Sequence, residues 1–108
     1  DETGGPNHVN NFCFAPVHAD TRTGELIYTN AYYYIAHFSK YIQPGAKRIS
    51  TATSRSQLLT TAFQNPDKSI AVVVMNQSDK ASNYYLWING KAVQAYAPAH
   101  SMNTLVIK

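Results

Sequence analysis

The chain has 108 residues, a length that suits one domain with a modest hydrophobic core. Hydrophobic residues make up 44% of it and charged residues 14%, a composition typical of folded rather than disordered chains. The formal net charge of +3 comes from scattered basic residues, so the basic stripe of a nucleic-acid-binding protein is missing. The single cysteine, Cys13, excludes a disulfide framework and a cysteine-based metal cluster within this chain.

The longest uninterrupted apolar run, Ile70–Met75, is far too short to cross a bilayer. No secretion signal stands at the start, and the first residue is not methionine. We therefore expect the chain to begin inside a longer protein, and its cellular compartment stays unknown.

The first sixteen residues are predicted to form a loop, because Gly4-Gly5-Pro6 and several asparagines supply turn chemistry. Two short strands, Pro16–Asp20 and Glu25–Tyr28, then flank the sequence TRTG, a glycine-containing connection of hairpin length. These features predict a loop followed by a small β-hairpin.

A helix is expected over Ala31–Ile42, with Asn30 as its N-cap. Pro44-Gly45 ends it, because proline cannot continue the hydrogen-bond ladder. We expect one side of this helix to present more apolar surface than 108 residues can cover. The apolar stripe recurs at helical spacing and consists of Ala31, Tyr34, Ile35, Phe38 and Ile42.

After Gly45 the apolar pattern changes to a period of two and predicts six strands of an antiparallel sandwich or barrel. Ile70–Met75 is apolar on both faces, as is typical of a central strand covered on both sides. Asn89-Gly90 is the strongest turn signal, because both residues tolerate the positive φ of a type I′ hairpin. The predicted strands are Arg48–Ser54, Gln57–Gln64, Ile70–Asn76, Asn83–Ile88, Ala92–Ala97 and Met102–Ile107.

Hydrolysis of a glycosidic bond needs two carboxylates that face each other across it. Asp1 and Glu2 are adjacent, so in an extended segment they point to opposite sides. The other carboxylates stand in or beside predicted turns, where capping and solvation are their ordinary roles. They are Asp20, Glu25, Asp67 and Asp79. We therefore assign no acid/base pair and no catalytic residue to this chain.

The four histidines lack the spacing that places two imidazoles on one metal ion, so neither a metal nor a cofactor is predicted. His37 lies on the predicted helix beside Phe38 and is expected to make a structural hydrogen bond. The serines have no nucleophile-elbow context, so nothing indicates a Ser–His–Asp triad. The histidines are His8, His18, His37 and His100.

Aromatic residues form two groups. Tyr32-Tyr33-Tyr34 spread over about 200° of a helix and cannot make one platform, so we expect one or two rings to face inward and another to lie at a domain seam. In the second group, with Tyr84, the rings of Tyr85 and Trp87 share a strand face, and Tyr96 lies across the hairpin. The favoured interpretation is a half-buried cross-strand cluster, and the alternative is a carbohydrate platform.

The loop Asp1–Cys13 is the best candidate for a binding site. Asparagines in a Gly-Gly-Pro frame suit sugar hydroxyls, which need donors and acceptors in fixed positions. The alternative is a turn network that only supports the loop. For Asn11 the two interpretations are balanced, and for Asn7 the supporting role is favoured.

Four stretches of the chain resemble glycoside hydrolase family 30, the glucosylceramidase-like enzymes. GGPNHVNNFC at Gly4–Cys13 is similar to the loop after the eighth strand of that family's (β/α)8 barrel. Ala15–Asp20 and then Tyr33–Ile49, with HFSKYIQPGAKRI, resemble the return of that loop and the eighth helix. AVVVMNQSD at Ala71–Asp79 and HSMNTLVI at His100–Ile107 resemble strands of the family's β-sandwich.

The resemblance implies a mainly β fold in two parts. Residues 1–45 would be the last loop and α-helix of the catalytic (β/α)8 barrel, and residues 46–108 a C-terminal antiparallel β-sandwich. It implies that Asn11 contacts the sugar in the −1 subsite, with Asn7 and His8 as weaker candidates, and that both catalytic glutamates lie upstream. Phe14 stands where many relatives have aspartate, and His8 where some have tryptophan, which leaves the sugar specificity open.

We therefore expect the C-terminal region of a retaining β-glycosidase that acts on β-linked glucosides or related glycosides, inactive as an isolated fragment. Its partners would be the rest of the barrel and N-terminal strands that complete the sandwich, with no nucleic acid and no membrane span. An isolated fragment is expected to dimerise through an open sheet edge. The alternatives are a free-standing carbohydrate- or protein-binding β-sandwich module and a purely structural domain.

Overall fold

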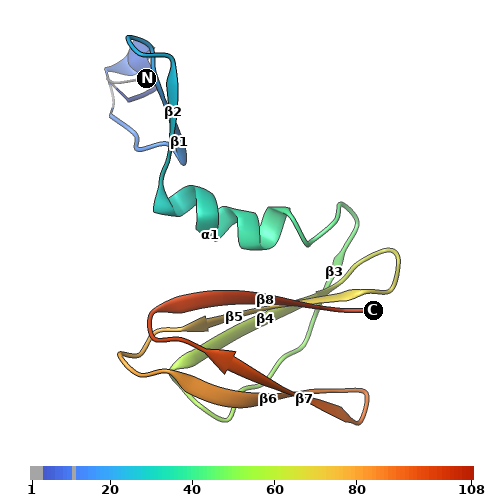
Figure 1. The fold of residues 1–108 in the computed structure, drawn as a ribbon. Coiled ribbons are helices and arrows are strands. Elements are labelled where there is room, and N and C mark those ends of the chain that lie inside the picture. Colours follow the sequence, from blue (N-terminus) through green and yellow to red (C-terminus); the bar gives the residue numbers. More distant parts are fainter. Residues whose placement is uncertain (1–3, 11) are drawn as a thin grey trace. The chain divides into compact units, whose positions relative to one another are not determined.

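A computed structural model describes residues 4–10 and 12–108, apart from the side chain of Asn7. The chain forms two compact units, Asp1–Ala36 and His37–Lys108. The boundary falls within helix α1, Asn30–Ser39 (Figure 1). Within the described residues, no helix has both the length and the apolar character that a bilayer crossing requires.

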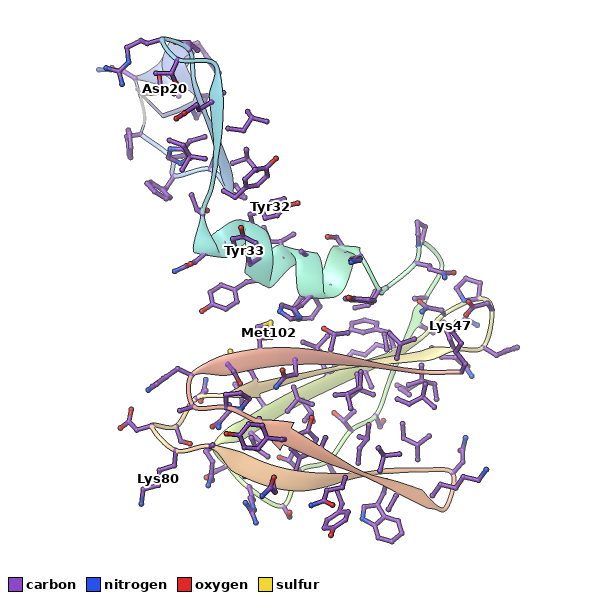
Figure 2. All side chains as sticks on the ribbon, viewed as in Figure 1. Asp20, Tyr32, Tyr33, Lys47, Lys80 and Met102 are labelled. Atoms are coloured by element: carbon purple, nitrogen blue, oxygen red, sulfur yellow. The ribbon has the colours of Figure 1, made fainter. Side chains whose placement is uncertain are left out.

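The first unit is built on the predicted hairpin. After a short 3-10 helix η1 (Asn7–Val9), strands β1 (Val17–Asp20) and β2 (Glu25–Tyr28) pair antiparallel. Asp20, at the turn in Figure 2, accepts a hydrogen bond from the Arg22 backbone N–H at 2.9 Å. The hairpin prediction is confirmed, and a carboxylate that bonds its own turn stabilises it.

Helix α1 begins one residue before the predicted helix and ends at Ser39, three residues before the predicted end at Ile42. Asn30 is its first residue, so Thr29 occupies the preceding position instead of the predicted cap. The early end has a clear cause. The Tyr41 carbonyl and the Gln43 N–H, which would continue the helical ladder, bond the side chain of Asn65 at 2.9 Å each.

All ten residues of α1 are described, and none of them is buried. The stripe residues Tyr34, Ile35 and Phe38 are exposed, which agrees with the predicted excess of apolar surface. Tyr32, Tyr33 and Tyr34 are also exposed, so the prediction that one or two rings face inward was wrong. Tyr32 instead meets Tyr28 and Tyr33 edge-on, at 4.7 and 5.3 Å between ring centroids (Figure 2).

The second unit contains two antiparallel sheets that face each other as layers (Figure 1). The four-stranded sheet has the order β3-β4-β5-β8, and the opposite layer is the two-stranded ribbon β6-β7. This is the predicted mainly β, antiparallel sandwich. The strands are β3 (Lys47–Ile49), β4 (Leu58–Gln64), β5 (Ile70–Asn76), β6 (Ser82–Ile88), β7 (Lys91–Ala97) and β8 (Ser101–Ile107).

Strand β5 is central and covered on both faces, as predicted. Val72 and Val74 belong to the core between the two sheets, while Ala71 and Val73 are buried on the other face. On that other face Thr104 pairs with Val73, and the Thr104 hydroxyl lies 2.9 Å from Nδ1 of His37. The expected structural hydrogen bond of His37 is therefore present.

The turn and strand predictions hold except at β3. Asn89 and Gly90 have φ values of 50° and 76° and join β6 to β7, in agreement with a type I′ hairpin. Strand β3 stops at Ile49 rather than Ser54. The run from Ser50 to Ser54 is small and polar, so it has no apolar face to hold it on the sheet.

Two buried amides hold the ends of β5. Asn65, before the strand, bonds Tyr41, Gln43 and Ser69 as donor or acceptor. Asn76, the last residue of β5, is only 1% exposed and donates to the carbonyls of Lys80, Ala97 and Pro98 at 2.8–3.2 Å. It thereby ties β5 to the following loop, where Lys80 lies (Figure 2), and to the end of β7.

Replacement of Asn76 is predicted to destabilise the sandwich strongly. Asn76→Ala removes the amide that donates to three carbonyls, of which two also accept hydrogen bonds from the hydroxyls of Ser78 and Ser101. The loss of these amide bonds at a buried position should lower the free energy of unfolding by about 2–4 kcal/mol. Urea denaturation followed by circular dichroism measures this loss. The neighbouring Gln77→Ala, an exposed position, is the control and should stay within about 0.5 kcal/mol of the parent chain. Equal effects of the two substitutions would contradict this role of Asn76.

Asp67 is predicted to make stability depend on acidity. Hydrogen bonds from the Ser69 hydroxyl and the Ser69 N–H, at 2.6 and 2.9 Å, hold the pKa of Asp67 below its ordinary value of 3.8. The folded state therefore binds a proton here less readily than the unfolded state. This contribution is complete above the unfolded pKa and is lost as pH falls below about 4 through the folded pKa.

Denaturation curves at pH values between about 2 and 6 test this. Asp67→Asn removes the carboxylate, and Ser69→Ala removes the hydroxyl bond but keeps the backbone N–H bond. Both variants should flatten the loss of stability toward acid, and Asp67→Asn should do so more. Glu25→Gln, at an exposed strand position, is the control. An unchanged acid profile in both variants would show that Asp67 does not contribute.

Candidate functional site

The loop that the sequence singled out is closed by a short backbone bridge. The Cys13 N–H donates to the Gly5 carbonyl at 2.8 Å, and the two residues pair as an isolated antiparallel bridge. Gly4 has a φ of +71°, and a Cβ there would lie 2.6 Å from the Phe12 ring. Glycine is thus required at position 4 both by the backbone angle and by the neighbouring ring.

The predicted sugar-binding residues can be placed only in part. Asn11 lies outside the described residues. Asn7 and His8 belong to η1, where the side chain of Asn7 is not described and His8 is exposed. The roles of Asn11, Asn7 and His8 in substrate binding therefore stay predictions.

Beside the loop bridge is a shallow hollow of about 310 Å³. Its walls are mainly backbone and small apolar groups, and Nε2 of His18 is buried without a hydrogen-bond partner among the described residues. The Phe14 ring lies 4.3 Å from the His18 ring. The lining residues are Gly4, Gly5, Pro6, Cys13, Ala15 and His18. None of these lining residues carries a carboxylate.

Three of the four acidic side chains in the described residues are engaged in turns or surface pairs, and the fourth, Glu25, is exposed on β2. Asp20 pairs with Arg22 at 3.2 Å, Asp67 bonds Ser69, and Asp79 lies 2.6 Å from Nε2 of His100. None of these arrangements places two carboxylates across a substrate-sized gap. Across residues 4–10 and 12–108, no cluster of three or more histidine, cysteine or acidic residues forms that could hold a metal ion.

A larger groove of about 800 Å³ lies between the two sheets of the second unit. Residues of β4 and β5 form one wall, β6 forms the other, and the segment from Ser50 to Arg55 lies along it. The hydroxyl of Tyr84 is buried without a partner among the described residues, and burial raises the pKa of Tyr84 above 10.0. The sandwich is therefore open between β6 and the β3–β4 connection.

The aromatic group on the ribbon lies on its outer face. Tyr85 pairs with Gln94 and Asn83 with Tyr96, so Tyr85, Trp87 and Tyr96 share one face. Their exposed fractions are 64%, 71% and 59%. The favoured prediction of a half-buried cluster was wrong for these three rings, and only Tyr84 faces inward. Alternation predicted the shared face, but exposure depends on whether another layer covers the ribbon.

By class, the second unit is a two-layer antiparallel β-sandwich, which follows a loop, a hairpin and a helix in the sequence. The comparison of sequences then gives the family. Residues 45–105, more than half of the chain, match the glycosyl hydrolase family 30 beta sandwich domain. The chain belongs to glycoside hydrolase family 30.

Known relatives agree with this assignment. The chain is 38% identical to the lysosomal acid glucosylceramidase of Mus musculus over 78 residues, 71% of this chain and 15% of that protein. It is 39% identical to the putative glucosylceramidase 1 of Caenorhabditis elegans over 84 residues, 76% of this chain and 16% of that protein. The chain thus spans about one sixth of these relatives.

Two solved structures share the fold. The structure of SrfJ from Salmonella typhimurium superposes with a TM-score of 0.91 at 29% sequence identity. The match covers 98% of this chain and 24% of the SrfJ chain. The endo-β1,6-glucanase BT3312 superposes with a TM-score of 0.81 at 26% sequence identity. That match covers 94% of this chain and 23% of the BT3312 chain.

Proposed function

We propose that this chain is the C-terminal accessory β-sandwich, together with the last barrel loop and helix, of a retaining β-glycosidase that cleaves β-linked glucosides. The match of residues 45–105 to the family 30 sandwich carries this proposal, and the identity to glucosylceramidases supports the substrate class. The chain spans only a small share of those relatives, so the catalytic centre is assigned to the remainder of the parent protein.

The chemistry of the chain supports this division of roles. A retaining glycosidase needs an acid/base carboxylate and a nucleophile about 5–5.5 Å apart. The described carboxylates Asp20, Asp67 and Asp79 are engaged locally with Arg22, Ser69 and His100. The two catalytic glutamates would come from upstream barrel strands, and this chain would contribute the rim of the sugar site and a bracing domain.

The proposed division into residues 1–45 from the barrel and 46–108 as the sandwich has its own support. The family match begins at Gly45 itself, which has a φ of +87° and follows the helical segment. The division would also explain the exposed apolar stripe of α1, because the rest of the proposed barrel would cover this stripe in the parent protein.

We further infer that strands from the parent's N-terminal end complete the sandwich beside β6. Among the described residues β6 pairs only with β7, and the groove between the sheets opens along β6 and the segment from Ser50 to Arg55. The hydroxyl of Tyr84 on β6 is buried without a partner in the described chain. An added strand would bond the unpaired edge of β6 and close this side of the groove. In the isolated chain, the same open edge would pair with a second copy.

The proposed function is tested by comparing the isolated chain with the longer gene product. The longer protein should hydrolyse 4-nitrophenyl β-glucoside, and nuclear magnetic resonance should show that the first-formed sugar is the β-anomer. The 108-residue chain should show no turnover, because no acid/base pair is expected in it. Turnover by the pure chain that is abolished by Glu2→Gln would defeat the proposal, as would an α-anomer from the longer protein.

Asn11 is predicted to act on catalysis rather than on folding. An amide that bonds a sugar hydroxyl strengthens its interaction toward the oxocarbenium-like transition state. In the longer enzyme, Asn11→Ala should lower kcat/KM by roughly ten- to a thousand-fold, which corresponds to about 1.5–4 kcal/mol. The melting temperature of the 108-residue chain should change little.

Asn7→Ala is the control within the same loop, because a supporting role is expected there. It should affect melting more than the chemical step. If Asn11→Ala kept full activity in the enzyme and unfolded the isolated chain, Asn11 would be a scaffold residue.

A further inference from the structure

The β6-β7 ribbon has aromatic or apolar side chains on both of its faces. Its inward residues Tyr84, Leu86 and Ile88 pack against the core between the sheets. A ribbon at the outside of a sandwich normally presents polar residues to solvent on its other face. Here that outer face instead carries Tyr85, Trp87 and Tyr96.

The three rings form a row along the ribbon. Tyr85 and Trp87 are two residues apart on β6, about 6.8 Å along the strand. Tyr96 is diagonal to Tyr85 across the pair, at about 7–8 Å between their backbone positions. The recorded ring contacts join other residues, so these rings are not stacked on one another. Each ring therefore has room to receive a planar or disc-shaped partner.

The other three positions of this face decide what chemistry the partner has. They are Asn83, Gln94 and Ala92, so the six outward positions include two amides and no charged residue. Neither amide side chain has a hydrogen-bond partner among the described residues. Uncharged rings flanked by free donors and acceptors complement a neutral ligand with an apolar face and an edge of hydroxyls. Nucleic acid and anionic lipid would instead require cations at this face.

Completion of the sandwich by another strand would leave this face open. A strand adds at the edge of β6 through backbone hydrogen bonds, whereas the aromatic row lies on the face of the ribbon. The groove between the sheets is lined by Leu86 and Ile88 on the inward side of β6, and Asn83, Tyr85 and Trp87 also border it. A strand added at this edge would lie beside Tyr85 and Trp87, while their exposed rings project from the outer face.

We propose that Asn83, Tyr85, Trp87, Gln94 and Tyr96 form a binding face for a neutral oligosaccharide. The apolar faces of successive pyranose rings lie on the row of aromatic rings, and the two amides bond the sugar hydroxyls. Occupation of this face requires no hydrolysis.

Trp87 allows a direct test, because it is the only tryptophan in the chain. Its fluorescence in the 108-residue chain is titrated with glucose hexasaccharides of β-1,3, β-1,4 and β-1,6 linkage. A stacked sugar removes water from the indole, so saturable quenching or a blue shift is expected with at least one of them. Tyr85→Ala and Tyr96→Ala should each weaken binding about tenfold, as loss of an interface anchor does. These exposed side chains can be truncated without loss of the core.

Tyr33→Ala is the matched control, since Tyr33 is an exposed tyrosine on α1. It should leave the sugar titration unchanged. Because Trp87→Ala removes the fluorescent reporter, its binding is measured by electrophoresis in gels that contain the corresponding soluble glucan. The parent chain should be retarded in these gels, and the variant should not. A fluorescence response to phosphatidylcholine or phosphatidylserine vesicles without any response to sugars would replace this proposal with a membrane contact. The absence of response to all three hexasaccharides would overturn it and would leave the glycosidase tests unaffected.

Discussion

The second unit depends on the burial of both faces of β5. Val72 and Val74 face the core between the sheets, and Ala71 and Val73 are buried on the other side. A strand with this composition cannot lie at the surface, so it needs paired strands on both edges and cover on both faces. The chain meets this need by leaving β5 for the ribbon β6-β7 and returning as β8 beside β5.

A strand that is buried on both faces also creates a polar problem at its ends. Backbone carbonyls in the adjoining turns lose water and need donors from the protein. Asn65 and Asn76 solve this problem at opposite ends of β5. The amide of Asn65 donates to the Tyr41 carbonyl and to the Ser69 hydroxyl, and that of Asn76 donates to the carbonyls of Ala97 and Pro98. The same amide of Asn65 decides where the helical segment stops, so the polar anchors also shape the chain before the sandwich.

Local patterns predicted most of the secondary structure because the signals are local. Alternation and the Asn89-Gly90 turn gave β4 to β8 within about one residue. Patterns failed where distant residues decide the outcome. The end of α1 depends on Asn65, 22 residues beyond Gln43 in the sequence. The extent of β3 depends on whether small polar residues find a partner strand.

The candidate sites show the same limit. Sequence pattern placed Tyr85, Trp87 and Tyr96 on one face, yet it favoured a half-buried cluster because aromatic pairs across strands usually pack inward. Their exposure follows from the position of the ribbon as an outer layer, which no local pattern encodes. For Asn11 the loop pattern left sugar binding and support of the loop balanced, because an asparagine in a glycine-rich loop has the same local signal in both cases. Only the resemblance favours sugar binding, and that role stays a prediction.

Alternate residues of the ribbon therefore have two different roles: the inward residues pack on the core, and the outward residues face solvent. Two-stranded ribbons are marginal by themselves, so β6-β7 depends on its inward side chains and on Ala97, which is fully buried in the core. The outward rings add little to that stability because they remain in solvent. Selection for folding alone would favour threonine, lysine or glutamate at these outward positions, which keep an exposed ribbon soluble and discourage aggregation. Three large rings together with two free amides at those positions are better explained by a ligand than by packing.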